Sequence, residues 1–384
     1  MKSQDILKQI IVWYFSTMRS EAERKKVAYI SAFTPVEILR AMDIVCFYPE
    51  SQAVMMIGSG KGRDYISESS KMGYSINLCG YARAHLGAAN SKDFTMFPRP
   101  DFIVGSNNQC GTIHYWFKRI GIEFGVPVFL LDYPSAEFAA SHLNAYIDSQ
   151  HKSLIKFISD ISANEMDNRK LAESINYSKI ACEYWQKIHE LAKQTPSKIK
   201  ALELFNYMMP LVIARGTKLA ADYYKCLYEE KAISVRAENE NLRILWYGYP
   251  LWFLKNRLPG SIVADCIVST YTMWWVLDYG SSEDLTSLID AYRNTYLNLP
   301  IENRLQRLKI MIEEYAIDGV VIHVNRSCKR DVIGVDSIKK MLHKIDTPCA
   351  IFEADMMDEK AYVSGSVDNK INIFLDIINQ KKPA

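Results

Sequence analysis

The stretch DFIVGSNNQCGTIHYWFKRIGIEFGVPVFLLDYP, residues 101–134, predicts a strand, a polar turn, a helix and a second strand. DFIVG at 101–105 and VFLLD at 128–132 are short apolar runs typical of buried strands. Between them, apolar residues at helical spacing predict one buried helix face, formed by Ile113, Trp116, Phe117 and Ile120. Ligands of open parallel sheets bind at the carboxyl ends of the strands. Cys110, in the turn after the first strand, therefore lies at a predicted ligand-binding position.

Strands alternate with helices on both sides of a long helical region. The alternation covers residues 1–150 and 241–384, whereas charged residues at helical spacing fill 151–240. Such alternation favours parallel sheets with right-handed crossovers. The sequence therefore predicts an α/β fold with two parallel-sheet domains and a helical insertion between them. Among its elements are a strand at 261–266 (SIVADC) and a helix capped by Thr34.

The composition of the chain is that of a globular protein. Its 384 residues are 49% hydrophobic and 23% charged, enough for two or three domains. A formal net charge of +2 gives no electrostatic reason to expect a nucleic acid as partner. The longest N-terminal apolar run, residues 10–15, is far shorter than the roughly 20 residues of a membrane span, and no small-residue cleavage site follows it. We therefore expect a cytoplasmic protein without membrane association.

Several common catalytic and nucleotide-binding motifs do not occur in the sequence. There is no G-x-x-x-x-G-K-[ST] P-loop, no G-x-G-x-x-G after a strand, no G-x-S-x-G and no H-E-x-x-H. The eight cysteines include no C-x-x-C pair, which argues against a zinc ribbon and a thioredoxin-type site. Disulfides are also not expected in a cytoplasmic chain.

Three cysteines share one setting in the sequence. Cys79, Cys110 and Cys328 each stand in a polar or glycine-bearing turn at the start of a predicted helix. The helix dipole and free backbone N–H groups favour a thiolate there, and such N–H groups also hydrogen-bond to the sulfides of iron–sulfur clusters. Shared metal ligation is one interpretation, and unrelated buried thiols are the other. The remaining cysteines are predicted to be core thiols: Cys46, Cys182, Cys226, Cys266 and Cys349.

Five stretches of the chain resemble the 2-hydroxyacyl-CoA dehydratase and benzoyl-CoA reductase subunit family. They occur in the family's order and spacing from near the N-terminus to the C-terminus, and only the central helices lack a distinctive match. The stretches are TPVEILRAMDIVCFYPE (34–50), GYSINLCGYARAHLG (73–87), PDFIVGSNNQCGTIHYW (100–116), DGVVIHVNRSCK (318–329) and FEADMMDEKAYVSGSVDNKINIFLD (352–376).

The resemblance implies a fold, a cofactor and partners. Members of the family fold as two flavodoxin-like α/β units plus a helical part. They bind a [4Fe–4S] cluster between the units through three cysteines, which map onto Cys79, Cys110 and Cys328. They act as heterodimers with a homologous second subunit, or, in one branch, as homodimers with a larger fused cluster on the same cysteines. A separate ATP-dependent iron–sulfur activator protein supplies one electron at low potential, in agreement with the missing P-loop.

The resemblance also implies a reaction. A 2-hydroxyacyl-CoA dehydratase eliminates water from an acyl-CoA thioester whose β-proton is barely acidic. Adding one electron gives a ketyl radical anion, which expels the hydroxyl group and makes the β-proton acidic enough to remove. In benzoyl-CoA reductases, similar electrons enter the aromatic ring instead. A hypothesis from a different class is a non-catalytic electron-relay subunit whose cluster never meets substrate.

Glu50 ends the YPE segment and is, by resemblance and placement, the candidate catalytic base or polar contact near the iron. The alternative is a helix-capping surface carboxylate. Further candidates for the same crevice are Ser31, Thr34, Arg83 and His85, although a half-buried structural role is favoured for His85.

Two other features of the cysteine turns lead to expectations. Asn107 and Asn108 are predicted to cap the helix at Cys110. The turn at Cys328 is basic, and its cations are interpreted either as contacts to CoA phosphates or the activator, or as solvated surface: Arg326, Lys329 and Arg330.

Overall fold

The computed structural model describes residues 2–93, 97–135, 141–234 and 240–381. It contains two four-stranded sheets in which every pair of neighbouring strands is parallel. The first sheet has the order β2-β1-β3-β4, and its strands are β1 (Val27–Ile30), β2 (Val45–Phe47), β3 (Phe102–Ser106) and β4 (Val128–Leu131). The second has the order β6-β5-β7-β8, and its strands are β5 (Ile244–Tyr247), β6 (Cys266–Ser269), β7 (Gly319–Asn325) and β8 (Cys349–Ala354).

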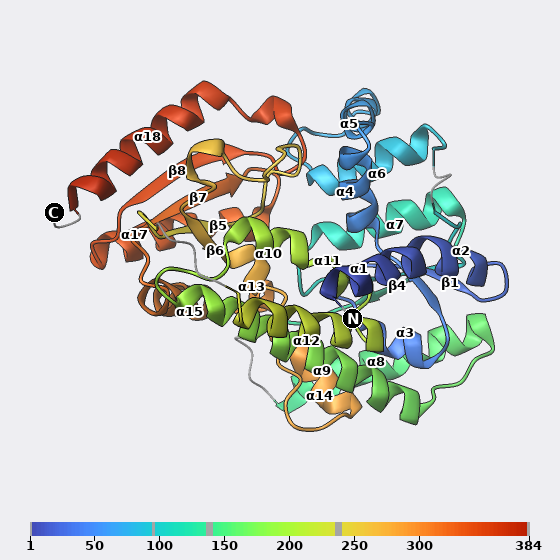
Figure 1. Ribbon diagram of the computed structural model, residues 1–384. Helices are drawn as coiled ribbons and strands as arrows, with labels where there is room; N and C mark the ends of the chain where they lie inside the picture. Colours follow the sequence, from blue (N-terminus) through green and yellow to red (C-terminus); the bar gives the residue numbers. More distant parts are fainter. Residues whose placement is uncertain (1, 94–96, 136–140, 235–239, 382–384) are drawn as a thin grey trace.

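Both sheets have the strand order of flavodoxin-like folds, in which the direction of winding changes between the first and third strands. Figure 1 shows the second sheet on the left and the first unit on the right, with the long helices of the central section at the bottom of the view. The predicted α/β fold with two parallel sheets is confirmed. The strand predicted at 261–266 is misplaced, because residues 260–262 form a short 3₁₀ helix and β6 begins where Cys266 pairs with Ile244.

Helices of the first unit cover its sheet and carry much of the candidate site. They are α1 (Ser3–Val12), a π-helical turn (Trp13–Thr17), α2 (Met18–Glu21), α3 (Val36–Ala41), α4 (Pro49–Gly58), α5 (Gly62–Lys71), α6 (Gly80–Asn90) and α7 (Thr112–Phe124). The predicted apolar face of α7 is buried as expected. The predicted cap of α3 is wrong by one residue: Pro35 is the N-cap, and the Thr34 hydroxyl instead pairs with that of Ser31 at 2.8 Å.

The helical section begins near residue 141 and ends at residue 232. Its helices are α8 (Ser141–Ser162), α9 (Asn168–Glu190), α10 (Ala201–Tyr207), α11 (Met209–Ile213) and α12 (Lys218–Ala232). α12 packs along α9 and also reaches α1, so this section is held against the first unit. The domain boundaries at residues 150 and 240 stay predictions.

Helices of the second unit complete the fold. They are α13 (Thr270–Met273), α14 (Leu285–Arg293), α15 (Ile301–Glu314), α16 (Lys329–Val332), α17 (Val335–Lys344) and α18 (Ser364–Lys381). Within the described ranges, no helix combines the length and the apolar character that crossing a membrane requires.

A fully buried carboxylate, that of Glu37 in α3, ties all three parts of the chain together. Tyr279 and Tyr292 of the second unit donate hydrogen bonds to its oxygens at 2.9 and 2.8 Å. Ser178 of α9 donates a third at 2.5 Å, and the Arg215 guanidinium lies 3.9 Å away. The two tyrosines belong to the second unit, whereas Ser178 and Arg215 belong to the helical section. Since a buried charge is tolerated only when it is paired and hydrogen-bonded, the carboxylate specifies how the parts pack.

We expect Glu37→Ala to lower the free energy of unfolding by about 3–5 kcal/mol, because it leaves the buried Arg215 without its counter-ion. Chemical denaturation followed by circular dichroism measures this loss. The matched control is Glu183→Ala, at an exposed position of α9, which should change stability by less than about 0.5 kcal/mol. A loss at residue 37 no larger than that of the control contradicts the role of this carboxylate.

Candidate functional site

One cavity of about 300 Å³, called the thiol cavity below, has Cys79, Cys110 and Cys328 in its wall. Cys110 follows β3 and Cys328 follows β7, two strands that occupy equivalent places in the two sheets. Cys79 stands directly before α6. The structure thus brings together the three cysteines singled out in the sequence, at the carboxyl ends of both sheets.

Each of the three thiols lies at or just before the start of a helix, where backbone N–H groups have no partner within the helix. Cys79 is the N-cap of α6, Cys328 is the N-cap of α16, and Cys110 precedes Gly111, the N-cap of α7. In every case the backbone N–H of the residue three positions later lowers the thiol pKa, and these residues are Ala82, Ile113 and Asp331. All three thiols therefore have the same local setting, beside a free backbone N–H at the start of a helix.

Burial outweighs these N–H groups and raises the pKa of each thiol above its ordinary value of 9.0. For Cys79, the neighbouring Cys110 and Cys328 raise the pKa further. In the metal-free protein the thiols are therefore protonated at neutral pH. Among the described residues, no three His, Cys, Asp or Glu side chains converge as they would on one metal ion. Sulfurs spread around a cavity suit a polynuclear group, in which each thiolate binds a different metal atom.

Glu50 lies in the wall of the same cavity, in the first turn of α4. Its side chain is only 6% exposed, so the alternative of a surface carboxylate is wrong. Oε1 accepts hydrogen bonds from the Ala32 backbone N–H at 3.0 Å and from Gln109 Nε2 at 3.1 Å, whereas Oε2 has no partner among the described residues. Burial raises the pKa of Glu50 to about 7, so the carboxyl group exchanges its proton near neutral pH.

A second cavity, of about 220 Å³, adjoins the thiol cavity and is called the apolar cavity below. Glu50, Tyr81, Gln109 and Tyr249 line both cavities and form the wall between them. Apart from Glu50, these residues were not singled out in the sequence. For Tyr249 a signal was present, because GYP at 248–250 directly follows β5 as the Cys328 turn follows β7.

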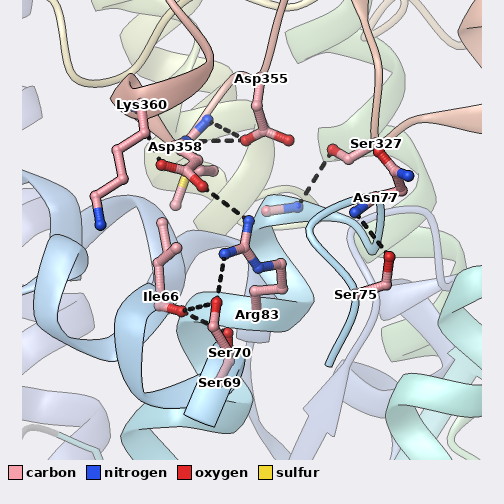
Figure 2. A network of polar contacts seen from close by, with 12 residues as sticks. Ile66, Ser69, Ser70, Ser75, Asn77, Arg83, Ser327, Asp355, Asp358 and Lys360 are labelled. Atoms are coloured by element: carbon pink, nitrogen blue, oxygen red, sulfur yellow. Dashed lines mark hydrogen bonds and ion pairs between the residues drawn. The ribbon is translucent and has the colours of Figure 1, made fainter. Parts of the chain in front are cut away.

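Arg83, a sequence candidate, does not line the thiol cavity but holds its two sides together. Figure 2 shows this side chain reaching from α6 to Asp358, in the segment after β8, and to Ser70 of α5. The distance from Arg83 Nη1 to Asp358 Oδ2 is 2.9 Å, and both side chains are buried. In the same region the Gly80 N–H donates to Ser327 Oγ at 3.4 Å, which links the residues next to Cys79 and Cys328.

At Gly80 the two units are in tight contact beside the thiols. A Cβ atom at this position would lie 2.5 Å from Asp355 Oδ1 and 2.7 Å from Met357 Cβ. These distances leave no room for any side chain. The approach of α6 to the segment after β8 therefore requires glycine.

The other crevice candidates have structural roles. Ser31 and Thr34 hydrogen-bond to each other, and Ser31 Oγ accepts from the Ser106 N–H at 3.0 Å, so they join β1 to β3. His85 is buried in the first unit, and its Nε2 lies 2.8 Å from Gln52 Oε1. Burial lowers the pKa of His85 to about 3, so it is neutral. The structural role favoured for His85 agrees with this placement.

The prediction that Asn107 and Asn108 cap α7 is wrong. The N-cap of that helix is Gly111, and among the described residues no side chain makes a capping hydrogen bond to it. Asn108 Nδ2 instead donates to the Phe33 carbonyl at 3.1 Å and to the Tyr292 carbonyl at 2.9 Å. Asn107 Oδ1 accepts from the Tyr133 N–H at 2.6 Å. Both asparagines therefore position the turn that carries Cys110 rather than cap the helix.

The basic turn at Cys328 is only partly turned to solvent. Lys329 and Arg330 line the thiol cavity, and Lys329 is exposed. Arg330 donates to the Leu297 carbonyl at 2.5 Å and to Asn298 Oδ1 at 3.0 Å, so it fixes the turn to the preceding loop. Lys329 is thus the exposed cation beside the cavity.

Known proteins resemble the chain over almost its whole length. A sequence model of the family described as 2-hydroxyglutaryl-CoA dehydratase, D-component, matches residues 31–378. The (R)-phenyllactyl-CoA dehydratase alpha subunit of Clostridium sporogenes is 27% identical, over 100% of this chain and 97% of the relative. The lactoyl-CoA dehydratase alpha subunit of Anaerotignum propionicum is 24% identical, over 98% and 97%. A benzoyl-CoA reductase subunit of Thauera aromatica is 25% identical, over 92% and 89%.

We expect Gly80→Ala to lower the free energy of unfolding by about 1–3 kcal/mol, because the new methyl group forces apart the segments beside Cys79 and Cys328. Thermal or chemical denaturation measures the loss. Gly58→Ala is the matched control: it also lies in a helix, no atom lies within 4 Å of its Cβ, and alanine there should be neutral or stabilising by up to about 1 kcal/mol. Equal effects of the two substitutions would show that the approach at Gly80 imposes no constraint.

The Glu50 carboxyl group predicts a pH dependence of stability for the metal-free protein. Its pKa is about 7 in the fold against an ordinary value of 4.5, so the folded state holds the proton more tightly than the unfolded chain. The contribution of Glu50 to the free energy of unfolding is therefore greatest below pH 4.5 and is lost as pH rises from about 4.5 to 7. Glu50→Gln removes this loss, and the stability of the variant relative to wild type should rise by roughly 3 kcal/mol between pH 4.5 and 8.

Urea denaturation at a series of pH values measures this difference, with Glu183→Gln as an exposed control. Parallel stability profiles for wild type and Glu50→Gln would mean that the carboxyl group is not buried as described.

Proposed function

Because the chain belongs to the 2-hydroxyglutaryl-CoA dehydratase D-component family, we propose that it is the iron–sulfur subunit of a reductive 2-hydroxyacyl-CoA dehydratase. In this proposal, Cys79, Cys110 and Cys328 hold a [4Fe–4S] cluster. The observation that carries it is the meeting of these three thiols in one cavity between the carboxyl ends of two flavodoxin-like sheets.

The donor set fits such a cluster. Three thiols supply ligands for three irons of a cubane and leave one iron without a protein ligand. The repulsion that raises the pKa of Cys79 is relieved by a cationic group, and the N–H groups of Ala82, Ile113 and Asp331 are placed to stabilise the thiolates. When bound, the cluster would supply the thioester with single electrons at low potential.

Glu50 has the properties of a catalytic base or polar contact beside the proposed cluster. It lines the thiol cavity, carries a free oxygen and has a pKa of about 7, so it is able to accept a proton and return it near neutral pH. Gln109 fixes the other oxygen and thereby orients the carboxyl group. In the proposed reaction Glu50 contacts the substrate hydroxyl group or removes the β-proton.

Contact with substrate is supported over a pure electron-relay role by the apolar cavity. A relay subunit needs only a site for the cluster, whereas here a further cavity of about 220 Å³ shares Glu50 and Gln109 with the thiol cavity. An aromatic acyl-CoA reductase subunit is the second candidate, and the similarity to the benzoyl-CoA reductase of Thauera aromatica favours it. The reaction product separates the two: a dehydratase yields an enoyl-CoA, and a reductase yields a ring-reduced thioester.

Partners are part of the proposal. Several relatives are named alpha subunits, which supports pairing with a second, homologous subunit. The absence of a P-loop motif from the sequence supports electron delivery by a separate ATP-dependent activator.

We expect Cys79→Ser, Cys110→Ser and Cys328→Ser each to lower the iron and sulfide content of anaerobically purified protein and to abolish the cluster's EPR signal. A hydroxyl group at each position is a poor replacement for a thiolate ligand. Cys266→Ser is the control, since Cys266 lies fully buried in β6 outside the cavity and should leave the iron content unchanged. Wild type without iron, or three variants with full iron, would disprove the assignment, provided that circular dichroism shows folded protein.

A further inference from the structure

The apolar cavity is enclosed by three parts of the chain. The helical section contributes a wall of flexible and aromatic side chains from α10, α11 and the residue between them: Phe205, Met208, Met209 and Val212. The second unit contributes Trp274 and Trp275, which are almost fully buried. Phe33 of the first unit lines the cavity too and stacks on Trp275 with ring centroids 4.7 Å apart.

The size of the cavity suits an aromatic ring or a branched alkyl group. An apolar cavity of about 150 Å³ is large enough to bind benzene, and this one measures about 220 Å³. Methionine side chains adapt to irregular apolar ligands, and aromatic walls favour stacked or edge-on rings. A small acyl group such as propanoyl would leave much of the apolar wall without contact.

The polar end of the cavity lies at the wall shared with the thiols. Gln109 Oε1 and Glu50 Oε2 are buried there, and neither accepts a hydrogen bond within the described part of the chain. Two buried acceptors without a donor are costly and call for a partner. A ligand with a hydroxyl group at this end and an apolar tail toward α11 satisfies both halves of the cavity.

The charges of the wall disfavour a second carboxylate. Among the described residues that line the cavity, Glu50 and Arg257 are the charged ones. Arg257 Nη1 donates to Asn206 Oδ1 at 2.8 Å and its guanidinium lies 5.6 Å from the Trp252 ring centre, whereas its Nε has no partner among the described residues. Arg257 also lines a separate polar groove with Arg63 and Lys255, so it stands at the rim. A carboxylate deeper in the cavity would lose its hydration and approach the Glu50 carboxyl group instead of this cation.

We propose that the apolar cavity selects 2-hydroxyacyl thioesters with an aromatic or branched aliphatic acyl group and excludes small acyl groups and those ending in a carboxylate. The inference rests on the proposed function, because it takes the acyl-CoA thioester from there. The class of acyl group and the residues that select it are not part of that function. Val212 and Met209 meet the tail, and Glu50 and Gln109 meet the hydroxyl group.

The test measures binding rather than turnover, so it does not depend on the activator. The anaerobically purified full chain is titrated calorimetrically with thioesters that cannot lose water: 3-phenylpropanoyl-CoA, 4-methylpentanoyl-CoA, propanoyl-CoA and glutaryl-CoA, with free CoA as reference. The first two should bind about tenfold or more tighter than propanoyl-CoA and glutaryl-CoA. Equal or tighter binding of propanoyl-CoA or glutaryl-CoA overturns the inference alone. If no thioester binds more tightly than free CoA, the proposed function itself fails.

A variant with a larger side chain in the wall tests whether the acyl-group selectivity arises in the apolar cavity. Val212→Phe should weaken 3-phenylpropanoyl-CoA binding at least tenfold and change propanoyl-CoA binding less than twofold. Val363→Phe, at a position that is 65% exposed and outside the cavity, should change neither. If Val212→Phe does not fold, Met209→Trp at the same wall replaces it. A cavity-filling variant that folds and keeps wild-type affinity for 3-phenylpropanoyl-CoA overturns the assignment of this cavity.

Discussion

The thiol cavity depends on the contact between α6 and the segment after β8. The two sheets have the same strand order and face each other through their carboxyl ends. The first unit contributes Cys79 and Cys110 to the cavity and the second contributes Cys328, so the three thiols are able to bind one group only if the units are held at a fixed distance. Gly80 sets how close the units come, and the buried ion pair of Arg83 with Asp358 keeps them in register. Buried ion pairs add little net stability, but a misplaced pair is costly, so they act on specificity. The buried Glu37 carboxylate likewise fixes how the first unit packs against the second, through Tyr279 and Tyr292.

The site collects groups that burial pushes toward their neutral forms. The three thiols have raised pKa values, and those of Glu50 and Asp331 are raised to about 7. A cavity of this kind is by itself electrostatically unfavourable for anions, and a cationic group changes that balance for all of them together. If the cavity holds the proposed cluster, its uptake would be coupled to the loss of the thiol protons.

Much of this arrangement could be predicted from local sequence patterns. The strand–turn–helix of residues 101–134 and the settings of the three cysteines depend on short-range periodicity and were found. The failures depend on partners distant in sequence. Asn108 donates to the Phe33 and Tyr292 carbonyls instead of capping its own helix. For Glu50, a sequence candidate, local patterns leave open whether the side chain is buried, because its contacts to Ala32 and Gln109 are distant in sequence. The apolar cavity could not be predicted, because its wall comes from three parts of the chain that no local pattern relates.

The short helices α10 and α11 lie in the section between the two sheets, away from the turns that carry the cysteines, yet they line the apolar cavity. Replacing side chains in residues 201–213 reshapes that cavity while the thiols, Gly80 and the Arg83–Asp358 pair keep their contacts. In the proposed function, choice of substrate and electron chemistry would thus be carried by separate pieces of chain. A scaffold divided in this way could be retargeted to another acyl group by exchanging one short segment, with the three cysteine turns left as they are.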